Sequence, residues 1–203
     1  NVQTIRIGSK ALGYWPYRFT TDNDAQEVLD FLKEMNDKGL HVSFMGHFKH
    51  PAELKTEAVK EAIQKIRATG TQIRTQSPIM KNINDSANTW RDMWKKQVSL
   101  GLIPYYMFLA RDTGAQDYFA VPLGRAWQIF QKAYQQVSGI ARTVRGPSMS
   151  AAPGKVQVLG TTEIKGEKVF MLRFLQGRVA NWVHRPFFAK YDSKAIWLDD
   201  LEP

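Results

Sequence analysis

The sequence predicts an α/β fold that ends in a small antiparallel β appendage. Up to residue 139, segments with strand periodicity alternate with amphipathic helical segments about every 30–35 residues. After residue 139, short strands of alternating apolar and polar residues follow one another, separated by glycines. Repeated strand–helix units imply parallel strands joined by helical crossovers, which gather the loops after the strands on one face. Ligands bind at that face in folds of this kind.

Four strands and four helices are expected before residue 139. In the first helical segment, Val28, Leu29 and Leu32 share one face at helical spacing. Pro78 cannot donate a backbone hydrogen bond, so the third strand is expected to end early. The expected strands are 2–8, 40–45, 71–79 and 103–109, and the expected helices are 24–35, 53–69, 86–99 and 122–137.

The rest of the chain has the pattern of an antiparallel sheet. Strands are expected at 156–159, 168–174 and 177–183, with turns at Gly166 and Gly177. We therefore divide the chain into a barrel-like part, residues 1–139, and a carboxy-terminal part, residues 140–203.

The composition fits a globular protein with acidic partners. The 203 residues carry a net charge of +9, with 43% hydrophobic and 23% charged residues, an ordinary balance for one globular core. Positive charge suits phosphate cofactors, nucleotides, nucleic acid or acidic substrates, but the basic residues are dispersed rather than gathered in one block. No apolar run approaches the roughly 18–20 residues of a membrane span. With no signal-peptide pattern, we expect a cytoplasmic protein without a membrane partner.

The absence of cysteine limits the chemistry available to these residues. It excludes disulfides, thiolate catalysis and a cysteine-ligated iron–sulfur centre within the sequence. The chain begins with Asn1 rather than Met, so we expect a processed product or a fragment.

The segment 145–155, Arg-Gly-Pro-Ser-Met-Ser-Ala-Ala-Pro-Gly-Lys, is the most informative stretch. Small residues let backbone N–H groups approach an anion closely. Lys155, at its end, can serve as a Schiff-base amine or as a phosphate contact. The alternative is a solvated surface loop with an ordinary lysine.

Polar residues also lie in and after the expected strands. Arg6 and Ser9 accompany the first strand and Gln76 belongs to the third, while Arg111 and Asp112 follow the fourth. Such residues can contact a ligand at the strand ends. Arg6 can equally form a surface ion pair, and Gln76 can cap a backbone group.

Two histidines follow the second strand. His47 and His50 have a His-x-x-His spacing that can contribute to a metal site. Two histidines alone make a weak site, so we predict no metal there. A histidine at a strand end more often hydrogen-bonds a ligand or the backbone.

Several segments, taken in order, resemble the lysine 2,3-aminomutase family of radical SAM enzymes. The first is Ile5-Arg-Ile-Gly-Ser9, and the second is Met45-Gly-His-Phe-Lys-His-Pro51 followed by a helix. The others are Thr75-Gln-Ser-Pro-Ile-Met-Lys-Asn-Ile-Asn-Asp85 and Pro104-Tyr-Tyr106. The resemblance implies the second half of a partial (β/α)6 barrel of the radical SAM type, comprising its last four strand–helix units.

The resemblance also implies three cofactors: S-adenosylmethionine, a [4Fe–4S] cluster and pyridoxal phosphate. The family's cluster binds three cysteines, and this chain has none. The expectation is therefore the carboxy-terminal half of an enzyme, inactive alone. Lys155 falls at the lysine that forms the aldimine with pyridoxal phosphate, although Ala-Ala-Pro-Gly replaces the family's glycine run. Arg6, Ser9, His47 and Gln76 are expected at the cofactor face.

The same resemblance argues against free lysine as the substrate. Lysine-specific members hold the substrate's distant ammonium with two aspartates, and Arg111 and Ser148 stand at those places here. Asp112 is one residue away from the first. An arginine facing the substrate favours a carboxylate, so we expect an anionic amino acid as the small-molecule partner.

A second interpretation belongs to another class of protein. The barrel half can be a non-catalytic nucleic-acid or protein binding module, consistent with the net charge and the exposed aromatics. Open strand edges in a half barrel further predict pairing with a second copy or cover by the chain's own tail.

Overall fold

The computed structural model describes residues 2–111 and 113–202, which divide into two compact units. The first unit comprises Asn1–Ser77, Thr89–Tyr105 and Val137–Thr143, and the second comprises Pro78–Asn88, Tyr106–Gln136 and Val144–Pro203. Each unit is described by itself. In each, the strand order follows the chain order.

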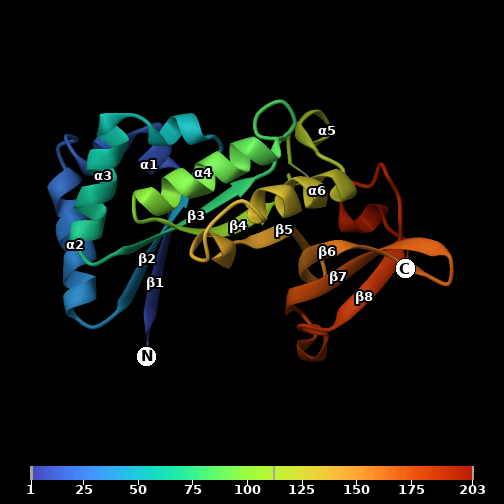
Figure 1. The fold of residues 1–203 in the computed structure, drawn as a ribbon. Coiled ribbons are helices and arrows are strands. Elements are labelled where there is room, and N and C mark those ends of the chain that lie inside the picture. Colours follow the sequence, from blue (N-terminus) through green and yellow to red (C-terminus); the bar gives the residue numbers. More distant parts are fainter. Residues whose placement is uncertain (1, 112, 203) are drawn as a thin grey trace. The chain divides into compact units, whose positions relative to one another are not determined.

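The first unit is a parallel sheet with helices on one side. Its strands are β1 (Thr4–Ser9), β2 (His41–His47), β3 (Gln72–Pro78) and the beginning of β4 (Ile103–Phe108). Its helices are α1 (Ala11–Tyr14), α2 (Ala25–Asp37), α3 (Glu57–Ala68) and α4 (Ala87–Ser99). These helices lie along one side of the parallel strands (Figure 1). The unit also contains short 3-10 segments at Pro16–Phe19, Pro51–Leu54 and Ala141–Thr143.

The strand register separates an apolar face from a polar face in this unit. Phe44 pairs with Ile7 on β1 and with Ile73 on β3, and the Phe44 and Ile73 side chains are buried. Because successive side chains of a strand point to opposite faces, these residues face the helices. The neighbouring positions, which include Arg6 and His47, lie on the opposite face.

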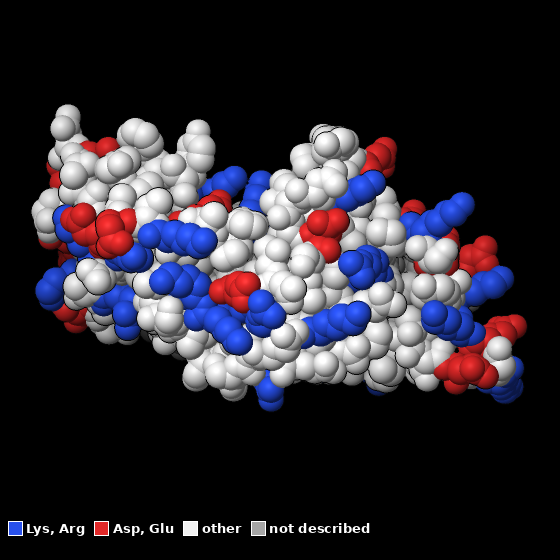
Figure 2. Space-filling model, turned by 45° about the horizontal axis from the view of Figure 1, so that its top comes forward, with Lys and Arg blue, Asp and Glu red and all other residues white. Residues whose placement is uncertain are grey.

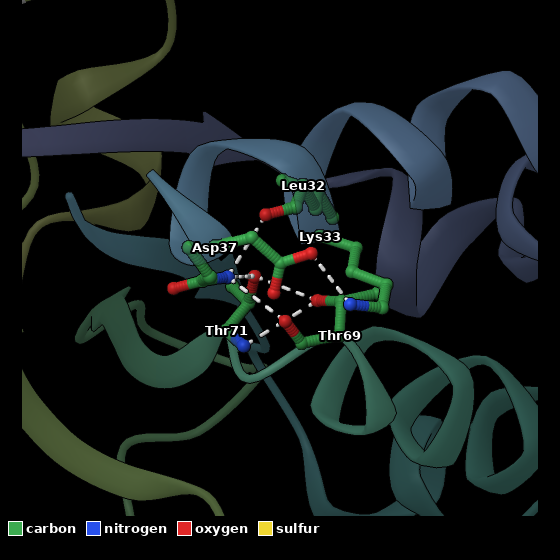
Figure 3. Close-up of polar contacts among 6 residues, drawn as sticks. Leu32, Lys33, Asp37, Thr69 and Thr71 are labelled. Carbon is green, nitrogen blue, oxygen red and sulfur yellow. Dashed lines mark hydrogen bonds and ion pairs between the residues drawn. The ribbon is translucent and has the colours of Figure 1, made fainter. Parts of the chain in front are cut away.

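A hydrogen-bonded cluster fixes the end of α2 against the turn between α3 and β3 (Figure 3). The Asn36 side-chain amide donates to the Leu32 carbonyl at 2.9 Å, to the Thr69 carbonyl at 3.0 Å and to Thr71 Oγ1 at 3.0 Å. The Thr69 hydroxyl also donates to Thr71 Oγ1 at 2.8 Å. The Asn36 amide and the two threonine hydroxyls therefore have hydrogen-bond partners, as polar groups removed from water usually do.

The second unit is mainly antiparallel. The end of β4 pairs in parallel with β5 (Arg145–Ala151), and β5, β6 (Gly154–Ile164), β7 (Glu167–Gly177) and β8 (Pro186–Lys190) follow as an antiparallel sheet. Helix α6 (Leu123–Tyr134) packs against β5 and β6, while α5 (Gln116–Phe119) is a single turn. Two 3-10 segments, Ala180–Trp182 and Leu198–Asp200, complete the unit.

The predicted fold class is confirmed: parallel strand–helix units are followed by an antiparallel β appendage. Two local expectations were wrong. Residues 145–151 form strand β5 rather than a loop, and residues 177–183 contain a 3-10 turn rather than a strand. The third appendage strand is β8 instead. The division at residue 139 stays a prediction. None of the helices in the described part of the chain is long and apolar enough to cross a membrane.

Candidate functional site

The polar face of the first unit carries three of the predicted site residues. His47 and Gln76 are register partners at the ends of β2 and β3, and Arg6 pairs with Ser43 on the same face. Arg6 is exposed, while His47 and Gln76 are half-buried. His47 and Gln76 thus lie side by side on this face, while Arg6 lies further back along the strands, level with Ser43.

His47 is held in its neutral form. The pKa of His47 is lowered from 6.5 to about 4, mainly by burial and also by the nearby charges of Lys49 and Lys10. Its Nε2 atom is buried and has no hydrogen-bond partner among the described residues. A buried polar atom without a partner is costly, so this nitrogen is available to a ligand.

Arg74 is a residue of this face that the sequence analysis missed. It lies on β3 two positions before Gln76, and its Nε atom is buried without a partner among the residues described. Its guanidinium lies 5.3 Å from the centre of the Tyr105 ring and donates to Gln72 Oε1 at 3.3 Å. Arg74 and Gln76 are two residues apart on one strand and therefore face the same way. This spacing was the signal that could have identified Arg74.

Ser9 and His50 have local roles in the fold. Ser9 Oγ accepts a hydrogen bond from the Ala11 backbone N–H at 3.0 Å, at the start of α1. His50 Nδ1 accepts from the Ala52 N–H at 3.2 Å, and the Glu53 carboxylate accepts from the His50 N–H at 2.9 Å. These bonds cap a 3-10 turn. Among residues 2–111 and 113–202, no group of three potential ligands could hold a metal ion.

Lys155 lies beside aromatic rings in the second unit. It is the second residue of β6, directly after the β5–β6 hairpin turn, and is half-buried. Its Nζ atom lies 4.6 Å from the centre of the Tyr106 ring and 5.3 Å from that of Phe108. The two rings stack with centroids 4.8 Å apart. This arrangement shields one side of the amine from water and gives it a defined direction.

Arg145 shares the same aromatic pair. It is the register partner of Tyr106, and its Nη1 atom donates to the Tyr106 hydroxyl at 3.2 Å. Its guanidinium carbon lies 5.7 Å from the ring centre. Two cations therefore converge on one tyrosine, which makes this part of the unit electropositive.

Of the predicted substrate residues, Ser148 lies on the sheet face that carries Lys155, as the register partner of Gln157. Ser148 is 0% exposed, and its hydroxyl donates to the Met107 carbonyl at 3.4 Å. Arg111 is exposed and follows the end of β4. Asp112 lies outside the described residues.

Gln157 and Arg173 extend the face that carries Lys155, and sequence reasoning missed both. Gln157 is two positions after Lys155 on β6 and pairs with Ser148 on one side and Arg173 on the other. The Arg173 Nε and Nη2 atoms donate to Gln157 Oε1 at 3.1 and 2.9 Å. For Gln157, the two-residue spacing from Lys155 on the same strand was the available signal.

The chain matches several aminomutases. It is 33% identical over 202 residues, 98% of its length, to a candidate L-lysine 2,3-aminomutase of Aquifex aeolicus (strain VF5). The chain is a homologue of the lysine 2,3-aminomutases. It is also 25% identical over 98% of its length to the L-lysine 2,3-aminomutase of Fusobacterium nucleatum, and 25% identical over 68% to that of Clostridium subterminale. The predicted resemblance is confirmed.

The homology covers only part of the relatives. The chain spans 51% of the Aquifex protein, 48% of the Fusobacterium enzyme and 31% of the Clostridium enzyme, so it covers about half or less of their length. No family model matches the chain. Among solved structures, a radical SAM methyltransferase from Sphaerobacter thermophilus superposes over 58% of this chain and 37% of its own, with a TM-score of 0.40 and 14% identity. No conclusion rests on so loose a superposition.

Proposed function

We propose that the chain is the pyridoxal-phosphate-binding part of an amino-acid 2,3-aminomutase, an isomerase, and that Lys155 attaches the cofactor. The observation that carries the proposal is the Lys155 amine, which lies 4.6 Å from the Tyr106 ring in a chain homologous to lysine 2,3-aminomutases. When bound, pyridoxal phosphate would supply the conjugated ring on which an amino group can migrate.

The residues around Lys155 fit that cofactor. Tyr106 and Phe108 offer flat apolar surface, and Arg145 adds a cation within the same cluster. The hairpin before Lys155 contains small residues, so backbone N–H groups can approach a phosphate closely. The tyrosine and phenylalanine rings would exclude water from one side of the amine, and Arg145 would hold the Tyr106 hydroxyl in place.

The proposed enzyme also uses a [4Fe–4S] cluster and S-adenosylmethionine. We place the cysteine ligands of a [4Fe–4S] cluster outside this sequence, which contains no cysteine, and expect the chain to be inactive alone. On the polar face of the first unit, His47 Nε2 and Arg74 Nε are buried without partners among the described residues. Together with Arg6 and Gln76, they would bind a cofactor on this face, and S-adenosylmethionine is the candidate. Ser9, whose hydroxyl accepts from the Ala11 N–H, would support this face through the strand end that it shares with Arg6.

The proposed substrate is an amino acid with an additional anionic group. Arg111 stands where lysine-specific members have an aspartate, and Ser148, at the second such place, is buried and bonded to Met107. Neither residue can hold a distant ammonium as a carboxylate does. Efficient conversion of free lysine by the intact enzyme would contradict this proposal.

A titration with pyridoxal phosphate tests the role of Lys155. Binding is followed by the visible absorbance of the protein-linked cofactor in wild type, Lys155→Arg and Lys168→Arg. Lys168 is a matched control because its amine also lies over a tyrosine, 3.8 Å from the centre of the Tyr191 ring. We expect the absorbance to vanish only in Lys155→Arg. An unchanged signal in that variant would overturn the proposal.

A nucleic-acid or protein binding module remains the second candidate because the net charge is +9. On the face drawn in Figure 2, however, lysine and arginine side chains are dispersed among acidic and uncharged residues. Salt-sensitive RNA binding would favour the module.

We also propose that the edge of β1, which pairs only with β2 in the described sheet, associates with a second copy of the chain. Light scattering would measure this association.

A further inference from the structure

Arg173 is an arginine fixed in place without an acidic partner. Two of its N–H groups donate to the same oxygen, Gln157 Oε1, at 3.1 and 2.9 Å. A guanidinium has more donors than these two bonds use. Among the described residues, no carboxylate lies within ion-pair distance of Arg173. Donors therefore remain for a ligand.

Gln157 holds the guanidinium in one orientation. Its side chain is 8% exposed, and its Nε2 atom donates to the Gly146 carbonyl at 3.3 Å. This bond fixes which way the amide points, so the oxygen faces Arg173. An arginine oriented before binding loses less conformational entropy when an anion arrives.

Few acidic residues lie near Arg173 along the chain. Between residues 118 and 191 the only acidic residues are Glu163 and Glu167, at the far ends of β6 and β7 from Lys155. The cross-strand neighbours of Lys155 are Ser150 and Gln176, and those of Arg173 are Gln157 and Pro186. None of these can neutralise an arginine.

We propose that Arg173, oriented by Gln157, forms an oxyanion-binding site on the face of the sheet that carries Lys155. The site takes a planar carboxylate or a phosphate, the groups that a guanidinium binds best. Its natural ligand rests on the proposed function: the anion is either the cofactor's phosphate or the extra acidic group of the substrate.

The first test measures anion binding by the chain itself. Inorganic phosphate and succinate are titrated while the Arg173 Nε–H resonance, assigned with Arg173→Lys, is followed by NMR. We expect Arg173→Gln to weaken binding about tenfold, the loss of one charge-assisted contact. Gln157→Glu, nearly identical in shape, would pair Arg173 internally and weaken binding to a similar extent.

Arg185→Gln is the control for charge, because Arg185 is exposed and has the same charge as Arg173. It should change phosphate affinity less than about twofold. Equal losses in Arg185→Gln and Arg173→Gln would overturn the proposal, since the binding would then be non-specific. Wild-type affinity for both anions in Gln157→Glu, with an unchanged circular dichroism spectrum, would overturn it as well.

Two further measurements show whether the bound anion comes from the cofactor or from the substrate. They also test the Arg173 site independently of Lys155. If the cofactor's phosphate occupies the site, Arg173→Gln weakens binding of pyridoxal phosphate but not of pyridoxal. If the substrate's acidic group does, pyridoxal phosphate and pyridoxal both bind as in wild type, although Arg173→Gln still weakens succinate binding. Lys155→Met should abolish cofactor attachment yet keep phosphate binding within about threefold, so either proposal can fail without the other.

Discussion

The two units present polar faces of different character. In the first unit, His47 and Arg74 have buried nitrogens without partners among the described residues, and His47 is neutral. In the second, Arg145 and Lys155 contact the Tyr106 ring, and Arg173 is bonded to Gln157. The first face thus leaves hydrogen bonds for a ligand to complete, whereas the second offers fixed positive charge.

The largest expected effect tests whether the geometry of the second unit depends on its hairpin. Gly154 has a φ of +152°, and a Cβ added there would lie 2.2 Å from the Gln176 carbonyl oxygen. We expect Gly154→Ala to lower the free energy of unfolding by about 3 kcal/mol in urea.

Gly139→Ala is the matched control, because a Cβ there meets no atom within 4 Å. It should change stability by less than about 0.5 kcal/mol. If the two variants are equally stable, the hairpin does not hold Lys155 as rigidly as the structure indicates.

The second prediction concerns the first unit, where His47 should make the free energy of unfolding depend on pH. Burial and the nearby Lys49 and Lys10 charges lower the pKa of His47 from 6.5 to about 4. Between these values the unfolded chain binds a proton that the folded chain does not. His47 therefore contributes stability above pH 6.5 that is lost as the pH falls toward 4. After a discount for solvent screening, we expect a loss of about 2 kcal/mol.

The measurement is urea unfolding of wild type and His47→Gln at pH 7 and pH 4.5. The wild type should lose more stability than the variant on acidification. A variant with the same loss as the wild type would show that His47 is not held neutral.

The smallest expected effect concerns the support of the first unit, away from either polar face. Asn36→Ala removes the hydrogen bonds to the Leu32 and Thr69 carbonyls shown in Figure 3. We expect a loss of about 1 kcal/mol in unfolding free energy. Gln26→Ala, on the same helix, removes only an exposed bond to Asp30 and should have little effect. A comparable loss in both variants would contradict the structural role of Asn36.

Periodicity predicted most of the first unit because burial and local pattern agree there. The helix expected at 86–99 is observed as Ala87–Ser99, and the strand expected at 71–79 ends at Pro78, as its ring requires. Strand β5 was missed because Gly146, Pro147 and Ser148 have low strand propensity. Pairing with β4 and β6 and burial of the segment decide its conformation, and neither is visible in local sequence.

The candidate site was predictable only where a motif marked it. Lys155 stood out at the end of a small-residue segment, and His47 and Gln76 at strand ends. Tyr105 and Tyr106 are adjacent in the sequence, yet one contacts Arg74 and the other Lys155, because adjacent strand residues face opposite ways. Arg173 gave no signal, since an arginine in an alternating strand is typical of a solvated surface.

The most direct test of the central claim is the attachment site of the cofactor. The chain is incubated with pyridoxal phosphate, reduced with borohydride and digested, and the modified peptide is identified by mass spectrometry. We predict modification at Lys155 at stoichiometric cofactor, with Lys168 unmodified despite its contact with Tyr191. Modification spread over exposed lysines, or retained in full in Lys155→Arg, would contradict the account.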